Sequence, residues 1–290
     1  MPSVSVVNGR AIVIEQLSAP QRVARFFLAP FTQTWHHRDL VEAILRRELQ
    51  ERFKGSVAGW VWAVIAPLMM LGVYAFAFTT TTKLPIEVSG SRLGYALFIF
   101  SGIIVFNFFS EVAFRAPMLL HEYSHFIKQT IFPSHMLAII STLRATAYSG
   151  IALIVMMLFQ VLTGHGLPWT CLLLPLILVP YLMFLMGLAW ILSAIGAFTR
   201  DAGYLMMTIV PLFMFITPIF FSHTQLPEPL DFWIYANGLT GFAEVTRDLT
   251  LLGKIPSLAV YAWTMFVSIF TFYLGYWFFD RYRNVIVDVI

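Results

Sequence analysis

The chain has 290 residues, of which 59% are hydrophobic and only 11% are charged, and its formal net charge is +3. Soluble domains carry about 25% charged residues, so this composition excludes a water-soluble globular protein, and the same counts exclude a disordered chain, a collagen or a coiled coil. The single cysteine, Cys171, excludes an internal disulfide framework and a thiolate zinc cage. The composition therefore predicts an integral membrane protein.

The chain begins with polar sequence. Met1 to Gln50 mixes acidic and basic residues and has no apolar core before a small-residue cleavage site, so we expect no signal peptide. We expect residues 1–34 to form a cytoplasmic N-terminal segment and residues 35–56 to form an amphipathic helix at the membrane surface. Its apolar residues recur at steps of three and four: Leu40, Val41, Ile44, Leu45, Leu49 and Phe53. The alternative is a charged helix that is merely solvated.

Six uncharged runs of 18 residues or more follow, each long enough to cross about 30 Å of hydrocarbon. They are Val57–Phe78, Leu93–Ser110, Ala145–Gly164, Thr170–Thr199, Ala202–Ser222 and Ile255–Phe279. The second run is the shortest. The sequence thus predicts an all-α integral membrane protein with six transmembrane helices in residues 57–290.

Basic residues in the loops orient these spans, because Lys and Arg are retained on the cytoplasmic side. The side that holds both termini carries Arg10, Arg22, Arg25, Arg38, Arg46, Arg47, Arg52, Lys54, Arg115, Lys128, Arg200, Arg281 and Arg283. The other side carries only Lys83, Arg92, Arg247 and Lys254. We therefore expect both termini in the cytoplasm.

Two connections are more than simple loops. Ala116–Pro133 is neither acidic nor rich in Gly and Ser, so we expect a folded cytoplasmic segment on which a partner docks, the alternative being an ordinary hairpin connector. His223–Pro256 contains turn residues and a cluster of aromatic residues, which predicts short interfacial or re-entrant helices on the outer side. The alternative for that segment is an aromatic anchoring belt without contact to a substrate.

Charged residues are scarce inside the spans. Glu111 and Arg144 lie near the inner ends of the second and third spans, and we expect them to pair across this hairpin, which would offset their burial. No relay of Asp, Glu or His crosses the spans, which disfavours an ion-coupled secondary transporter.

A metalloprotease motif deserves a test. His121-Glu122-Tyr123-Ser124-His125 matches H-E-x-x-H, in which two histidines one helical turn apart bind zinc. However, Glu244, the residue that would supply a third ligand, is expected on the opposite side of the membrane, about 30 Å away. We therefore predict no metal site and no catalytic residue. Gly253-Lys254 lacks the other residues of a phosphate-binding loop, so we also predict that this chain binds no nucleotide.

Taken together, these features resemble the permease subunits of type-2 ABC exporters, in particular the group that exports O antigens, capsular polysaccharides and teichoic acids. The resemblance covers about Asp39 to Arg283. Its most specific part is Arg46-Arg47-Glu48-Leu49, then Arg52-Phe53-Lys54-Gly55-Ser56, Gly59, Trp62 and Pro67. Looser matches are Phe126-Ile127-Lys128, Phe132-Pro133, Arg200-Asp201, Pro218-Ile219-Phe220, Leu226-Pro227, Asn237, Leu239, Glu244 and Arg247. Gly238 stands where this group usually has proline, and Thr246 where it has an aromatic residue.

The resemblance implies a homodimer in the bacterial inner membrane, joined to two copies of a separate ABC ATPase that holds the ATP and Mg²⁺. It implies that the ATPase-coupling loop comprises His121, Glu122, Tyr123, Ser124, His125, Phe126 and Lys128, with Phe126 as the anchor and Glu122 and Lys128 at the rim. It also implies an interface helix that acts through Arg46, Arg47, Glu48, Arg52, Phe53 and Lys54 and that could attract a lipid-linked phosphate. The expected cargo is a lipid-linked polysaccharide, which would slide along aromatic side chains. Our candidates for these are Trp62, Tyr74, Phe106, Phe109, Phe213, Phe220, Trp233 and Tyr235.

Other functions remain open at this point. A drug or lipid exporter would share the permease plan. A membrane enzyme, either the zinc metalloprotease or a glycan acyltransferase, would depend on His121 without any ATPase. A scaffold for an assembly would not depend on ATP.

Overall fold

The computed structural model describes residues 3–7, 10–14, 19–80, 91–129, 132–221 and 235–290. The chain divides into two compact units, Met1–Ala43 and Ile44–Ile290. The helices and strands are β1 (Ser3–Val7), β2 (Arg10–Ile14), α1 (Ala19–His36), α2 (Arg38–Glu51), η1 (Gly59–Val61), α3 (Trp62–Thr80), α4 (Arg92–Arg115), η3 (Ala116–Met118), α5 (Leu119–Glu122), α6 (Ser124–Gln129), α7 (Met136–Leu162), η4 (Trp169–Leu173), α8 (Leu174–Phe198), α9 (Asp201–Ile216), α11 (Leu239–Arg247), the π-helical η6 (Asp248–Leu252) and α12 (Leu258–Val289).

The first unit contains the two strands. β1 and β2 pair antiparallel, with Ser3 opposite Ile14 and Val7 opposite Arg10. This hairpin departs from the all-α prediction. Helix α1 follows it, and α2 begins in this unit and ends in the second.

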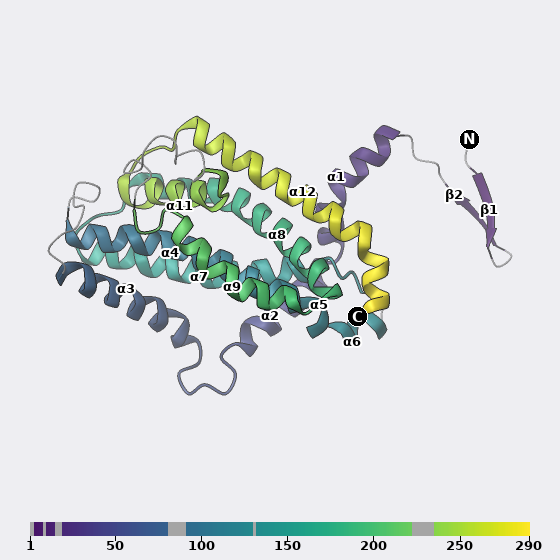
Figure 1. Ribbon diagram of the computed structural model, residues 1–290, viewed down its shortest axis with the longest axis horizontal. Helices are drawn as coiled ribbons and strands as arrows, with labels where there is room; N and C mark the ends of the chain where they lie inside the picture. The colour runs from purple at the N-terminus through teal and green to yellow at the C-terminus, as the bar shows by residue number, and fades with distance from the viewer. Residues whose placement is uncertain (1–2, 8–9, 15–18, 81–90, 130–131, 222–234) are drawn as a thin grey trace. The chain divides into compact units, whose positions relative to one another are not determined.

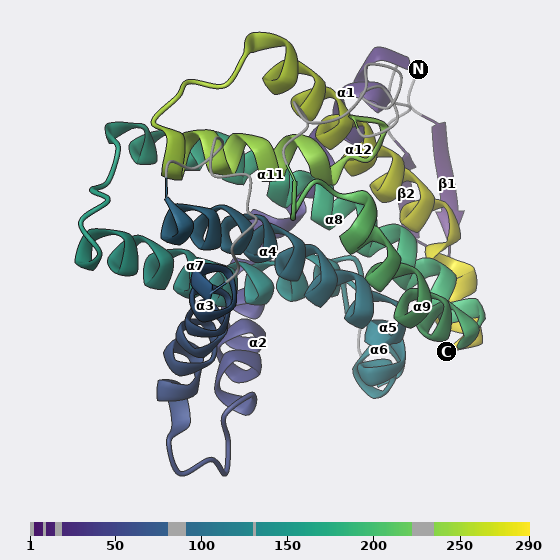
Figure 2. The ribbon, with the colours of Figure 1, turned by 60° about the vertical axis from the view of Figure 1, so that its left-hand side comes forward.

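The second unit is a bundle of helices, as predicted. Among its described residues, five helical segments are long and apolar enough to cross a membrane: Gly59–Phe78, Arg92–Glu122, Met136–Leu162, Trp169–Phe198 and Leu258–Ile286. They contain or overlap five of the six predicted spans. Helix α4 lies along α7, and α12 lies along α8, in both views of the ribbon (Figures 1 and 2).

Helix α4 forms the centre of the bundle. Of its most apolar 18-residue window, 83% is buried, against 11% for the window on α3. The sequence predicted the end of this span at Ser110, because Glu111 and Arg115 follow, but α4 continues through both residues. It can do so because both side chains are paired with opposite charges.

The fifth predicted span is shorter than expected. Helix α9 ends at Ile216 instead of Ser222, and its 16 residues rise only about 24 Å. Pro218 has no backbone N–H with which to continue the helix. The carbonyl oxygens of Pro218 and Ile219 instead accept hydrogen bonds from the guanidinium group of Arg247, a residue of α11.

Arg247 is buried and holds residues 217–220 in place. Besides the two carbonyl groups above, its Nε donates to Phe98 O of α4 at 3.1 Å, and its guanidinium carbon lies 3.9 Å from the centre of the Phe98 ring. Tyr95 donates to Phe220 O at 2.8 Å. Side chains from α4 and α11 therefore hold residues 217–220 in a non-helical conformation, because they bind the backbone carbonyl groups of this segment.

Glycines allow a close contact between two helices of the bundle. Helices α8 and α12 approach at Gly187 and Gly275, where a Cβ on either residue would collide with the backbone of the other helix. Small residues at a crossing let two membrane helices come into backbone contact. This pair fixes α12 against α8.

Candidate functional site

Glu48 lies at the centre of a buried charge cluster. It sits in the last turn of α2, and its side chain is only 2% exposed. Its Oε1 accepts hydrogen bonds from Arg115 Nη2 at 2.7 Å and from the Tyr123 hydroxyl at 2.6 Å. On its other side, Arg144 Nε lies 3.7 Å from Glu48 Oε2. One carboxylate thus joins α2, the end of α4, the start of the α5–α6 connection and α7.

Glu111 forms the second centre of the cluster. Its Oε1 lies 2.8 Å from Arg52 Nη1 and 3.3 Å from Arg144 Nη2, so the structure brings together Glu111 and Arg144 of the predicted hairpin pair. Arg115 also reaches Glu122 at 3.2 Å. Three guanidinium groups therefore face three carboxylates. Their charges cancel, which limits the cost of removing them from water.

Tyr123 connects this cluster to the predicted coupling segment. It lies between α5 and α6, where the chain turns out of the helix. Burial, and then the hydrogen bond to Glu48, raise the pKa of Tyr123 above its ordinary value. The hydroxyl therefore remains protonated and donates to Glu48 throughout the physiological pH range.

One side of the α5–α6 segment is exposed. Phe126 is 46% exposed, and the side chains of Glu122, His125 and Lys128 are exposed as well. In contrast, Ile127 is buried. Ser124 begins α6 and is partly exposed. The segment is folded, as predicted, and presents an aromatic ring among polar side chains.

His121 anchors the segment to the bundle. Its Nε2 lies 3.0 Å from Gly196 O of α8, so this nitrogen carries the proton and donates it. A Cβ on Gly196 would collide with the backbone of Pro117 in η3. The absence of a side chain at residue 196 therefore allows η3 and α5 to lie directly against α8.

This geometry differs from that of a zinc protease. Helix α5 ends at Glu122 and α6 starts at Ser124, so His121 and His125 do not share one uninterrupted helix. Glu122 is engaged by Arg115, and Glu244 by the Tyr235 hydroxyl at 2.7 Å. Across the described parts of the chain, no three His, Cys, Asp or Glu residues are grouped so as to hold a metal ion.

The interface helix predicted at residues 35–56 corresponds to α2, which ends at Glu51, and the other residues predicted on it divide into two groups. Arg46, Arg47 and Lys54 are exposed, and Arg47 pairs with Glu51 at 2.7 Å one turn further on. Phe53 instead turns toward the bundle, where its ring lies 5.4 Å from that of Trp60. Only part of the predicted set therefore faces solvent or headgroups.

The predicted path aromatics lie in several places. Phe106 and Phe109 of α4 are 6% and 7% exposed, and the Phe109 ring lies 6.1 Å from that of Phe213 on α9. Trp62 and Tyr74 lie on α3, and Trp62 is 46% exposed. The remaining two in the described chain are Phe220, whose ring lies 6.3 Å from Phe215, and Tyr235, which donates to Glu244. Trp233 lies outside the described residues.

Sequence reasoning missed two members of the site. Arg115 was assigned only to the orienting charges, and Tyr148 was not assigned at all. The guanidinium carbon of Arg52 lies 3.9 Å from the centre of the Tyr148 ring, so Arg52 makes a cation–π contact with this ring besides its ion pair with Glu111. The available signal for Arg115 was its position one helical turn after Glu111, just beyond the second apolar run.

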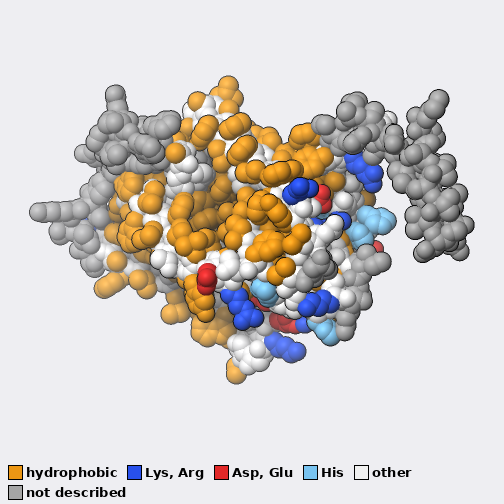
Figure 3. Space-filling view, turned by 45° about the vertical axis from the view of Figure 1, so that its right-hand side comes forward, with side chains coloured by type: hydrophobic (Ala, Val, Ile, Leu, Met, Phe, Trp, Pro, Cys, Tyr) orange, Lys and Arg blue, Asp and Glu red, His pale blue; other side chains and the backbone are white. Residues whose placement is uncertain are grey.

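The distribution of side chains fits a molecule that spans a membrane. In the space-filling view, apolar side chains cover most of the visible face, and charged side chains gather toward one end (Figure 3).

Comparison with known proteins identifies relatives of this chain. The sequence profile of the ABC-2 type transporters matches residues 39–251. An O-antigen export system permease protein RfbA of Klebsiella pneumoniae is 26% identical over 219 residues, which cover 75% of this chain and 82% of that protein. The protein of the same name from Myxococcus xanthus is 23% identical over 68% of this chain and 73% of its own length. The polysialic acid transport protein KpsM of Escherichia coli is 24% identical over 81% of this chain and 90% of its own.

Proposed function

The chain belongs to the ABC-2 type transporter family, and from this premise we propose that it is the membrane-spanning subunit of an ATP-driven exporter of a lipid-linked polysaccharide. It is a multi-pass membrane protein, and its relatives are named for O-antigen export and polysialic acid transport. These names support a polysaccharide cargo and a place in the bacterial inner membrane.

In this proposal the chain crosses the membrane six times, with both termini in the cytoplasm. The five long apolar helices supply five crossings, and α9 with residues 217–221 supplies the sixth. Two copies of the chain enclose the path for the polymer. The basic loop residues of the sequence support this orientation.

A separate ABC ATPase provides the energy, and the α5–α6 segment receives it. An exposed aromatic ring surrounded by charged side chains is a typical anchor for a protein partner, and Phe126 has this setting. The observation that carries the proposal is the link from Tyr123 to Glu48. Motion imposed on α6 reaches Tyr123, whose hydroxyl donates a hydrogen bond to Glu48. Glu48 in turn accepts a hydrogen bond from Arg115 at the end of the central helix α4.

The test uses the chain purified together with the ABC ATPase encoded beside its gene and reconstituted in lipid. We expect stable copurification, ATP-dependent export of the polysaccharide, and loss of ATPase binding in Phe126→Ala. Phe114→Ala is the matched control, because Phe114 is similarly exposed, at 39%, but lies on α4. A chain that binds no ATPase, or that shows a zinc-dependent activity requiring Glu122, would contradict the proposal.

A further inference from the structure

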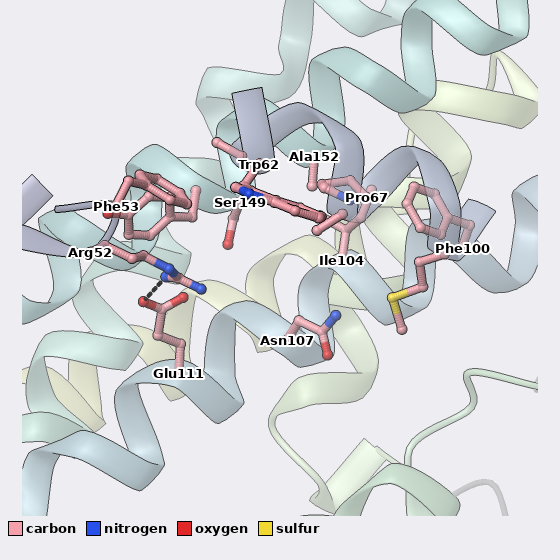
Figure 4. Close-up of a pocket in the computed structure, with 14 residues that line it drawn as sticks. Arg52, Phe53, Trp62, Pro67, Phe100, Ile104, Asn107, Glu111, Ser149 and Ala152 are labelled. Atoms are coloured by element: carbon pink, nitrogen blue, oxygen red, sulfur yellow. Dashed lines mark hydrogen bonds and ion pairs between the residues drawn. The ribbon is translucent and has the colours of Figure 1, made fainter. Parts of the chain in front are cut away.

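A cavity of about 290 Å³ lies beside the charge cluster, between the end of α2 and helices α3, α4 and α7. In Figure 4, Arg52 and Glu111 are joined at one side of this cavity and Phe100 lies at the other, with Asn107 and Ile104 between them along α4. Its volume corresponds to about ten water molecules. The mechanism proposed above does not use this cavity.

The lining changes from polar to apolar along its length. On α4 the lining residues are Glu111, Asn107, Ile104 and Phe100, whose spacing of four, three and four residues places them on one helix face. They span a rise of about 16 Å. On the opposing wall of α7, Ser149 is followed by Ala152, which packs against the buried apolar cluster that includes Phe100 and Ile104. On both walls the lining is therefore polar near Glu111 and apolar near Phe100.

Asn107 is the unusual residue of this lining. It is exposed within the largely buried helix α4, and its side-chain amide makes no hydrogen bond to another described residue. An amide in contact with hydrocarbon costs free energy unless a donor or acceptor satisfies it. A ligand that fits the cavity must therefore offer a polar group between its charged end and its apolar end.

Arg52 and Glu111 define the charged end. The guanidinium group has five N–H donors, and it contacts Glu111 through Nη1 and the Tyr148 ring through its face. The remaining donors suit a phosphate, and the neighbouring carboxylate suits a primary ammonium group, whose N–H donors a quaternary choline head lacks. A head that carries both charges matches this end better than a purely anionic head.

From this order of groups we infer that the cavity binds one membrane phospholipid with a phosphoethanolamine head. The phosphate lies at Arg52, the ammonium group at Glu111 and an ester carbonyl at the Asn107 amide, and one acyl chain lies against Ile104 and Phe100. The Glu111 carboxylate beside Arg52 favours this zwitterionic head over the purely anionic head of a polyprenyl phosphate or pyrophosphate. This inference does not rest on the transport function.

The experiment uses the full chain in phosphatidylcholine vesicles that contain phosphatidylethanolamine with a photoreactive group on one acyl chain. Mass spectrometry of the cross-linked peptides locates the lipid. We expect the main adducts on lining residues such as Met70, Ile104 and Ala152. Ala66→Phe fills the cavity from α3 and should reduce these adducts at least about tenfold, because a tightly filled site excludes the chain. Val64→Phe, two residues away and outside the lining, is the matched control and should leave them unchanged.

Asn107→Leu provides a second variant that keeps the size of the side chain and removes its amide. It should reduce the adducts about fivefold, the effect of one lost hydrogen bond. The same photoreactive group on phosphatidylglycerol should label the lining about threefold less, because one favourable charge contact is absent.

Three outcomes would overturn the inference. Adducts that are spread over the exposed face of α3 and are insensitive to Ala66→Phe would indicate only the general lipid boundary. Equal labelling by phosphatidylglycerol would contradict the assigned head. Displacement of the label by a stoichiometric amount of a polyprenyl pyrophosphate would assign the cavity to the lipid of the cargo.

Discussion

Glu48 and Arg115 form an ion pair of 2.7 Å in which the two side chains are only 2% and 16% exposed. The pair joins the end of α2 to the end of α4, and Tyr123 adds the α5–α6 segment to the same carboxylate. A buried pair of this kind adds little net stability compared with an apolar pair, but removing one partner leaves the other charge uncompensated. Its contribution is therefore to fix how three helices are connected.

Replacing Glu48 by Gln should destabilise the chain by about 3–5 kcal/mol, because Arg115 and Arg144 lose the carboxylate between them. Glu51→Gln is the control, since Glu51 pairs with Arg47 at the exposed surface, and its loss should cost less than about 1 kcal/mol. Unfolding followed in lipid nanodiscs measures both. Equal stability of the two variants would show that the buried Glu48 cluster contributes no more to the stability of the fold than the exposed Arg47–Glu51 pair.

Tyr123→Phe should leave the fold intact but weaken the connection to Glu48 by about 1.5–3 kcal/mol, the range for a hydrogen bond to a charged group. The pKa of Tyr123 is raised, so this bond is present below the ordinary tyrosine pKa and is lost only as the pH rises through the higher value of the folded protein. Coupling by this bond should thus be constant between about pH 6 and 9. A steep change within that range in the wild type, absent in Tyr123→Phe, would contradict this assignment.

Gly196→Leu should prevent η3 and α5 from seating on α8, because its side chain would occupy the position of the Pro117 backbone. We expect little monodisperse protein on gel filtration in detergent. Ile195→Leu, at the adjacent and 39% exposed position, should behave like the wild type. If Gly196→Leu were also monodisperse and functional, the contact between η3 and α8 would not be required.

Arg247→Met should release residues 217–220, since the carbonyl oxygens of Pro218 and Ile219 lose their donor at a cost of about 1–3 kcal/mol for each unsatisfied group. Hydrogen exchange of the amides at the end of α9 should become faster. Arg247→Lys should restore the protection only in part, because an ammonium group lacks the planar fork. Unchanged exchange in Arg247→Met would mean that another contact holds this segment.

The sequence predicted much of the fold because the long apolar runs dominate it. It also predicted that Glu111 and Arg144 would pair, since each is an isolated charge near the inner end of a neighbouring span. The end of α9 could not be predicted, because Arg247, which holds residues 218 and 219, lies about thirty residues further along the chain. Glu48 appeared only as part of a motif, and its central position depends on partners from α4, α7 and the α5–α6 connection.

The N-terminal hairpin had a sequence signal that went unused. Asn8-Gly9 lies between two short runs rich in Val and Ile, and such a pair is a strong indication of a two-residue hairpin turn. The long apolar runs that follow predict helices, and the all-α prediction was extended from them to the whole chain.

We propose that motion of the bound ATPase reaches the spanning helices through Tyr123 and Glu48. The most direct measurement is the amount of polysaccharide exported per ATP hydrolysed by the reconstituted complex, with wild type compared with Tyr123→Phe. We expect unchanged ATPase binding and a clearly lower export of polysaccharide per ATP in Tyr123→Phe, because the hydrogen bond to Glu48 is lost. Unchanged export per ATP in this variant would contradict it.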